Sequence, residues 1–523
     1  MRKFHICFTL LVFSVFSSNA QLVDSVSVAA QAYLGLTTGP EQALLINSDK
    51  WGLLRDDQQN LVAGGEFYAE KELFEKIKIK TVLQPTLRNS SPYETGDEEF
   101  GAWLNQYYAD FSLGKAFLRV GASDYQFTNL QGDLNPGSFI NSANARPIPS
   151  IVAGFSDFVD VPFTRGYMEI KGEIQHGWME DDRYVQKPFL HGKSAYAKIG
   201  GDLPVNLGGG IVHRAIWAGT DRSNGSNYDD TFDDFLRVFF GGQGTRGQTN
   251  TVAGGDFYGL GSNFGSLDVF LDVELKDFSF SLYHIKPWED TQQFGFSKFW
   301  VKYFRNIDYF NGVNVTTPWP FLRRIHFEYA QTKWQFGPGT SDPPGGVEVS
   351  DDPDGCIYNY CYNYGGRENY YNNFLYSNGW THYGRVVGTP LFFTQSRLLN
   401  FDSRDDFGSI YRRNFIYNNR MRSFTLGVEG DVLKSKLGYR ARFALTENFG
   451  NFYAQYGSSW QRFGEPFYFD QGVWVFYSHI ATSYRISEKT TLNFEVAADF
   501  GDIFNTSSFL IAIDYNLFSK RFK

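Results

Sequence analysis

Residues 266–283 read SLDVFLDVELKDFSFSLY, and this stretch decides the fold class. From Leu267 to Leu275 every second residue is apolar, and most residues between them are polar. After the tight turn Lys276-Asp277 the same alternation resumes. Because successive side chains of a β-strand point to opposite faces, the stretch predicts a hairpin with one face suited to lipid and one suited to water.

The same alternation recurs along the chain from about residue 62 to the C-terminus. It is clear in four further segments: Ile77 to Ile79, Tyr439 to Leu445, Leu492 to Val496, and Phe509 to Leu517. A β-sandwich would alternate in the same way, but its apolar faces would meet in a core. A strand at the chain end favours a barrel, since lipid does not tolerate an unpaired edge. We therefore expect an all-β transmembrane antiparallel β-barrel of about 18 strands.

The composition agrees with a membrane barrel. Aromatic residues make up 18% of the 523 residues, there are 53 glycines, and only three cysteines and four methionines are present. Membrane barrels need aromatic girdles, glycines where strands bend, and a polar lumen that lowers the mean hydropathy. Beyond the first twenty residues, no run approaches the roughly 18 apolar residues that a transmembrane helix requires.

The N-terminus predicts export. Arg2 and Lys3 precede an apolar run from Ile6 to Phe16, and Ser18-Asn19-Ala20 supplies a small-residue cleavage site. We expect three parts: a signal peptide (1–20), an N-terminal segment (21–61) with short helices at the periplasmic mouth, and the barrel (62–523). Long polar loops are expected on the outside at 128–150, 220–256 and 335–372.

Sequence motifs give little support to an enzyme. No His-Glu-x-x-His, Gly-x-Ser-x-Gly or paired-cysteine metal motif occurs. Gly192-Lys193-Ser194 imitates the end of a phosphate loop, but Lys187 stands where the first glycine of that loop belongs. We expect no catalytic residue, cofactor or metal, and the net charge of -9 gives no reason to expect nucleic acid as a partner.

Cys356 and Cys361 are the only cysteines after the signal peptide. They lie five residues apart in a polar loop, and an exported chain meets an oxidising environment. The sequence therefore predicts a disulfide within an external loop.

Three blocks of sequence resemble the capsule-assembly Wzi family. The first is KPFLHGKSAYAKIGGDLPVNLGGGIVHRAIWAGTD (187–221), which carries His191, Lys193, His213 and Trp217. The second contains Asn369, Tyr370, Tyr371, Asn372 and Asn373, then Tyr376, Gly379, Trp380, Gly384, Arg385 and Val387 to Leu391. The third is Asn418-Asn419-Arg420. The likeness spans about residues 60–515.

The resemblance implies an outer-membrane barrel of 18 strands with a short helical part. It further implies a lectin that attaches capsular or related extracellular polysaccharide to the surface of a Gram-negative cell. The implied partners are that polysaccharide, outer-membrane lipid, and the barrel-assembly machinery during insertion. His191, Lys193, His213, Trp217 and Arg420 fall on family motifs without an assigned role.

Residues of the second block also have the chemistry of a sugar site. Aromatic rings stack on the apolar face of a pyranose, and amide or guanidinium groups bind its hydroxyls. We therefore expect six residues to bind polysaccharide on an exposed outer rim: Tyr370, Tyr371, Asn372, Asn373, Trp380 and Arg385.

Basic residues gather between Arg385 and Arg442, and strand alternation places Arg440 and Arg442 in the lumen. Such a patch can attract an anionic sugar or neutralise lumen carboxylates, and we expect neutralisation, since large barrels need internal ion pairs. A diffusion porin remains the alternative function. A binding protein should have a lumen blocked by inward loops, whereas a porin should keep an open, charged constriction.

Overall fold

The computed structural model describes a barrel with its outer loops in part. The described residues are 23–73, 76–91, 99–126, 130–228, 230–242, 260–289, 307–335, 356–357, 360–361, 369–373, 375–401, 415–451, 469 and 471–521. The predicted signal peptide and most of the loop 335–372 therefore lie outside the described residues.

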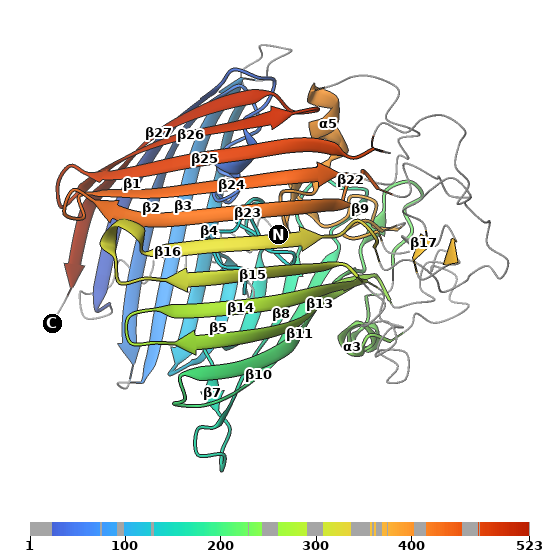
Figure 1. Cartoon of the computed structure of the whole chain (residues 1–523), viewed down its shortest axis with the longest axis horizontal. Coiled ribbons are helices and arrows are strands. Elements are labelled where there is room, and N and C mark those ends of the chain that lie inside the picture. The colour runs from blue at the N-terminus through green and yellow to red at the C-terminus, as the bar shows by residue number, and fades with distance from the viewer. Residues whose placement is uncertain are drawn as a thin grey trace.

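The barrel wall is one closed antiparallel sheet (Figure 1). The short strand β7 (Val159–Asp160) continues β6 along β8, so the wall has 18 strands, as the sequence predicts. These strands are β1 (Ser25–Thr37), β2 (Gln59–Leu73), β3 (Ile77–Ser91), β4 (Glu99–Leu113), β5 (Ala116–Ala122), β6 (Ser150–Phe155), β8 (Met168–Trp178), β10 (Phe189–Ile199), β11 (Val205–Trp217), β13 (Ser262–Glu274), β14 (Ser279–Glu289), β15 (Tyr309–Thr316), β16 (Arg324–Gln331), β23 (Met421–Val432), β24 (Leu437–Asn448), β25 (Val473–Arg485), β26 (Thr490–Gly501) and β27 (Thr506–Arg521). The first and last strands close the ring, with Ser25 paired to Arg521.

The wall has an apolar outside and a polar inside, as the alternation predicts. On β27, Phe509, Ile511 and Ile513 point outward and are 42–48% exposed. On β13, Val269 is exposed, whereas its neighbour Asp268 is buried in the lumen. An apolar outer face on a closed sheet is the surface that a lipid bilayer requires.

The two ends of the barrel differ. The end of β27, its partner Ser25 and the short turns, including Lys276-Asp277, lie at one end, and the long connections lie at the other (Figure 1). We call the second end the outer end, because outer-membrane barrels keep their short turns on the periplasmic side.

The N-terminal segment differs from our expectation. We predicted that the barrel begins near residue 62, but β1 already forms part of the wall, paired with both β2 and β27. Val26, Val28, Leu34 and Leu36 share the outward face of this strand, but the stretch Ala29 to Ala32 between them has little contrast and also suits a helix. The only helix described in this segment, α2 (Leu44–Asn47), lies in the β1–β2 connection at the outer end, so the predicted periplasmic placement is wrong.

The remaining elements are short. Those at or near the outer end are β9 (Val185–Gln186), β12 (Thr220–Asp221), α3 (Phe232–Phe240), β17 (Cys356–Ile357), β18 (Tyr360–Cys361), β19 (Thr381–His382), β20 (Arg385–Val386), β21 (Phe393–Thr394), α5 (Gln395–Phe401) and β22 (Ile416–Asn418). The 3₁₀ turn η2 (Pro320–Leu322) lies in a connection at the opposite end. Within the described part of the chain, no helix has the length and apolar character needed to cross a membrane.

Candidate functional site

Three segments fold from the outer end into the lumen, and together we call them the plug. They are residues 38–58, 130–149 and the described part of 369–401. Most of their side chains are buried, and they contact inward-facing residues of the wall. The second segment penetrates deeply, since Asp133 pairs with Arg324 at the end of β16 nearest the short turns.

The plug has an aromatic core centred on Phe139. The Phe139 ring lies 5.4 Å from Phe310 on the wall and 5.5 and 5.2 Å from Tyr370 and Tyr371, measured between ring centroids. Trp380 donates a hydrogen bond of 2.9 Å from its indole nitrogen to the carbonyl oxygen of Ile140. The second and third segments are therefore packed on each other and on the wall, since buried aromatic pairs favour such edge and tilted contacts.

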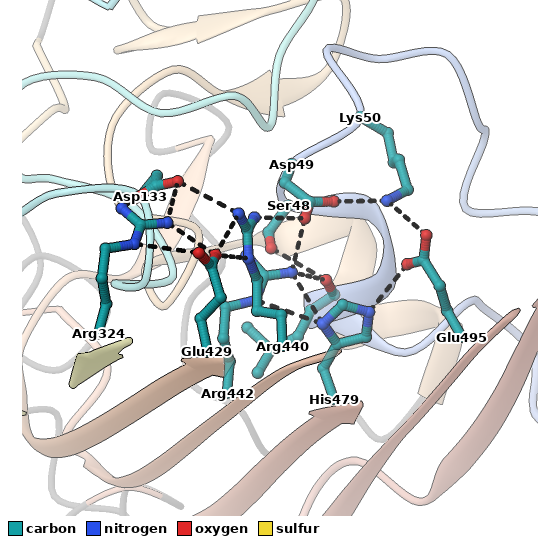
Figure 2. A network of polar contacts seen from close by, with 11 residues as sticks. Ser48, Asp49, Lys50, Asp133, Arg324, Glu429, Arg440, Arg442, His479 and Glu495 are labelled. Atoms are coloured by element: carbon teal, nitrogen blue, oxygen red, sulfur yellow. Dashed lines mark hydrogen bonds and ion pairs between the residues drawn. The ribbon is translucent and has the colours of Figure 1, made fainter. Parts of the chain in front are cut away.

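An ion-pair network joins the first segment of the plug to the wall (Figure 2). Lys50 lies 2.9 Å from both Asp49 and the wall residue Glu495. Arg442, also on the wall, lies 3.0 Å from Asp49 and donates a 2.9 Å hydrogen bond to the carbonyl oxygen of Leu45. Removal of one partner would leave the other charge buried and unpaired, which is costly in free energy.

The network continues toward the short-turn end (Figure 2). Arg324 and Arg440 both pair with Asp133 of the plug, at 2.6 and 3.2 Å, and with Glu429 of the wall, at 2.7 and 3.0 Å. Arg323 adds a pair with Asp431. In the described network five basic side chains face five carboxylates: Lys50, Arg323, Arg324, Arg440 and Arg442 against Asp49, Asp133, Glu429, Asp431 and Glu495. The lumen arginines therefore neutralise carboxylates, as we expected.

A second network holds the third segment. Arg397 of α5 pairs with Glu41 of the first segment at 2.9 Å and with Asp499 of the wall at 2.7 Å. Burial opposes the charged guanidinium, but these two carboxylates outweigh it and raise the pKa of Arg397. Arg385 pairs with Asp56 at 2.5 Å. The three segments thus form one connected body inside the barrel.

The residues predicted to form an exposed sugar-binding rim lie in this body, so their predicted placement is wrong. Tyr370, Tyr371, Asn372 and Trp380 are each at most 3% exposed. Their polar atoms have internal partners: the Tyr371 hydroxyl donates to the carbonyl oxygen of Phe139, and Asn372 donates to that of Ile416 at 2.8 Å.

The other two members of the predicted rim also have internal partners. The side-chain oxygen of Asn373 accepts hydrogen bonds from the backbone of Leu375 and Tyr376, and the Arg385 side chain is only 10% exposed. Aromatic rings and amides suit a sugar site, but they equally suit a buried loop that must pair its own backbone groups. The geometry shows that these residues pair with groups inside the protein.

The first family block lies on the outside of the wall. His191 and Lys193 on β10, and His213 and Trp217 on β11, share the strand face of the exposed residues Ile199 and Val205. The helix α3 covers them: Phe239 packs on the His191 ring, and the Lys193 amine lies 4.5 Å from the centre of the Phe239 ring. The histidines are thereby buried, although they point away from the lumen.

The sequence explains why α3 forms there. Thr231 and Asp234 make a reciprocal capping box, and Gly241 ends the helix with φ 68°. Phe235 and Phe239 lie one helical turn apart on the same face of α3, and this face packs against the wall. Among the described residues, no group of three or more His, Cys, Asp or Glu side chains is placed to hold a metal ion.

Arg420, from the third family block, has a structural environment. Its guanidinium donates hydrogen bonds to the backbone carbonyl oxygens of Lys333, at 2.9 Å, and Phe449, at 3.3 Å. It therefore ties two connections of the outer end together at the start of β23. The backbone register places Cys356 opposite Cys361, but their side chains lie outside the description and the disulfide stays a prediction.

A recess that sequence reasoning missed lies at the outer end, beside the plug. It has a volume of about 250 Å³. Its lining includes Trp103, Tyr107, Arg146, Glu180, His382 and Tyr383. These residues come from four separate parts of the chain, so no local pattern in the sequence marks them. His382 and Tyr383 do stand inside the second family block, next to residues that we singled out.

Comparisons with known proteins bear on the fold. No protein-family model and no curated protein matches the sequence. Among solved structures the chain is similar to Wzi of Escherichia coli, described as an outer membrane protein involved in group 1 capsule assembly and a carbohydrate-binding β-barrel. The TM-score is 0.53 at 10% identity, over 94% of this chain and 84% of that chain.

Two further matches have TM-scores below 0.5. They are Pseudomonas aeruginosa OccK5 (OpdH), with TM-score 0.43, 6% identity and coverage of 95% of this chain and 99% of that chain, and Acinetobacter baumannii OccAB4, with TM-score 0.44, 8% identity and coverage of 96% and 100%. The likeness to Wzi concerns the fold, and it agrees with the family resemblance that the sequence motifs indicate. The chain folds as an outer-membrane β-barrel.

Proposed function

We propose that this protein resides in the outer membrane and binds polysaccharide at the cell surface, without running a reaction and without conducting solutes. One observation carries the proposal: three segments of the outer end lie inside the lumen as a connected body, which ion pairs and hydrogen bonds join to the wall. A diffusion channel needs an open passage with charges left available to the solute.

The depth of the plug supports this function. Asp133 reaches the short-turn end of the barrel, and Asp49 is bound by Arg442 further along the lumen. A solute would have to displace these contacts, and separation of Asp49 from Arg442 leaves a buried guanidinium without its carboxylate partner. This cost favours a plug that stays in place in the folded protein.

The likeness to Wzi adds weight, because that protein is described as carbohydrate-binding. The family residues that we predicted to bind sugar do not supply the contact surface, since they are buried in the plug. We attribute sugar binding to the surface that the plug presents at the outer end.

Conductance separates the two functions. We expect the purified protein to give no conductance steps in a planar lipid bilayer. The control variant replaces residues 38–58 by a short Gly/Ser linker between β1 and β2, and it should conduct. Wild-type steps as large and as frequent as those of the control would overturn the proposal.

A cellular test addresses the polysaccharide. Deletion of the gene should release surface polysaccharide into the medium, while the total amount synthesised stays constant. Re-expression of the wild-type protein should restore retention. Cells that keep their full polysaccharide coat after deletion would rule out this function.

A further inference from the structure

The recess beside the plug is built by four separate parts of the chain. Trp103 and Tyr107 come from β4, Arg146 from the second plug segment, Glu180 from the β8–β10 connection, and Tyr383 from the hairpin β19–β20. The cavity of about 250 Å³ lies at the outer end of the barrel. This volume is just below the roughly 300–1,000 Å³ of drug-sized ligand pockets, so the recess has room for one small unit of a polymer.

Arg146 is held between two aromatic rings. Its guanidinium carbon lies 4.3 Å from the centre of the Trp103 ring and 4.5 Å from that of the Tyr383 ring. Stacking fixes the plane of the guanidinium group and leaves its N–H donors at the edge. The side chain is therefore held in place before any ligand arrives.

The charge around Arg146 is not balanced by protein carboxylates. Four arginines are electrostatic neighbours here: Arg55, Arg88, Arg146 and Arg385. Arg55 pairs with Asp57 and Arg385 with Asp56. Among the described residues Arg88 and Arg146 pair with no carboxylate, and the Arg88 guanidinium lies 4.8 Å from the centre of the same Trp103 ring. Arg146 therefore brings a positive charge with no carboxylate pair into a recess whose lining has one carboxylate, Glu180, and Arg88 adds a second positive charge on the Trp103 ring outside that lining.

The hairpin that carries Tyr383 departs from ordinary turn chemistry. Tyr383 has φ 50° and Gly384 has φ 76°, the left-handed pair of a two-residue turn that favours Asn-Gly. An aromatic side chain is strained at this position. The strain puts a ring that is 45% exposed at the mouth of the recess, and side chains in such conformations are concentrated at functional sites.

The wall of the recess also contains a polar atom without a partner. His382 is fully buried, and its Nδ1 contacts the carbonyl oxygen of Arg146 at 3.0 Å. Its Nε2 has no hydrogen-bond partner. An unpaired buried polar atom is costly, so this nitrogen at the wall of the recess is available to a polar ligand or a bound water.

From these observations we infer that the recess binds one pyranose unit of an acidic polysaccharide, a sugar that bears a carboxylate. The sugar ring stacks on Tyr383, its carboxylate accepts hydrogen bonds from Arg146, and Glu180 accepts hydrogen bonds from its hydroxyl groups. This inference rests on the proposed function and names its ligand class and its contact site. One recess gives a weak contact, and a long polymer gains affinity by occupying many barrels at once.

Matched oligosaccharides test the inference. Calorimetric titration of the purified protein would compare a β-1,4-linked glucuronic acid tetramer with cellotetraose, which has the same linkage and a hydroxymethyl group in place of each carboxylate. Galacturonate and mannuronate tetramers, with their neutral counterparts, extend the comparison. We expect at least one acidic tetramer to bind about tenfold more tightly than its neutral counterpart, the contribution of a charge-assisted hydrogen bond.

Two variants locate the site. Arg146→Gln should remove the preference for the acidic tetramer, and Tyr383→Ala should weaken both members of the pair. The control is Arg222→Gln, which removes one charge of an exposed ion pair with Asp182 at the same end of the barrel and should bind like the wild type. The inference is wrong if no acidic tetramer binds, or if Arg146→Gln and Arg222→Gln keep the same preference.

Failure of this inference is distinguishable from failure of the proposed function. If cells carrying Arg146→Gln and Tyr383→Ala together keep their surface polysaccharide, and the barrel stays non-conducting, the protein still holds polysaccharide but by another surface. If gene deletion has no effect on polysaccharide retention, the proposed function itself fails.

Discussion

At the scale of single residues, Arg442 joins the wall to the plug. Its side chain is 1% exposed, and it contacts Asp49, the His479 ring and the carbonyl oxygen of Leu45 within 3.0 Å. All its nearby partners except His479 belong to the plug. The attachment of the plug to the wall therefore depends on the Arg442 guanidinium, which is shielded from water.

We predict that Arg442→Met lowers the free energy of unfolding by about 3 kcal/mol, because Asp49 loses its buried partner and keeps Lys50 and the more distant Arg440. Guanidinium titration of the protein in lipid vesicles measures this. The matched control is Arg422→Met, which breaks a pair with Glu447 where the arginine is 35% exposed, and it should cost about 0–1 kcal/mol. Equal losses in the two variants would contradict the role of Arg442.

Asp49 makes the plug sensitive to acid. Burial alone would raise the pKa of its carboxyl, but Arg442, Lys50 and His479 outweigh burial and hold that pKa well below its usual range. The unfolded chain therefore binds a proton near pH 4 that the folded protein does not yet accept. The stability from this group is complete above about pH 4 and is lost as the pH falls through the folded pKa.

We therefore predict that the free energy of unfolding falls as the pH is lowered from about 4 to 2, and that it falls less in Asp49→Asn. The measurement is the same guanidinium titration, repeated across that range for both proteins. Parallel curves for wild type and variant would show that Asp49 is not the responsible group.

Residue types alone could not predict the site. Tyr370, Tyr371 and Asn372 have the chemistry of sugar contacts, but burial decides which use the chain makes of them, and burial depends on the whole fold. The recess was missed for the converse reason. Trp103, Arg146 and Tyr383 are unremarkable in sequence and become a group only when distant segments meet.

At the scale of elements, strands with strong contrast were predictable and strands with weak contrast were not. β13 and β27 alternate between large apolar and polar residues, so their two faces are evident. β1 also alternates, with Val26, Val28, Leu34 and Leu36 on one face, but the stretch Ala29 to Ala32 in its middle has little contrast and is equally typical of a helix. Its place in the wall comes from backbone pairing with β2 and β27.

The hairpin β17–β18 carries a prediction of its own. We expect Cys356 and Cys361 to form a disulfide, and the backbone register places them opposite each other. Reduction should loosen this loop and leave the circular dichroism of the barrel unchanged, because so short a loop gains little closure entropy. Thiol titration of the unreduced, folded protein should find no free thiol. Two free thiols would contradict the prediction.

At the scale of the whole molecule, a period of two residues was sufficient to predict a barrel of 18 strands. It could not predict the plug, because segments inside a lumen have neither the regular alternation of strands nor the low burial of ordinary loops. Their positions are set by pairs such as Arg397 with Glu41, whose members are 356 residues apart in the chain.

We predict that the loop 335–372 is outside the cell and that the Lys276-Asp277 turn is periplasmic, since these connections belong to opposite ends of the barrel. Protease added to intact cells should cut within 335–372 and spare the turn. Permeabilised cells provide the control for access to the periplasm. Cleavage at the turn in intact cells would reverse the orientation.

The pairing of β1 with β27 makes the chain a ring that is open at one place. Residues 25 and 521 are neighbours across the seam, so a short peptide could join the two ends without disturbing the wall. The backbone could then be cut at any of the short turns, and the same hydrogen bonds would form in a circularly permuted order. The position of the seam between the first and last strands therefore depends on where synthesis starts. The folded wall does not require the chain to begin at that position.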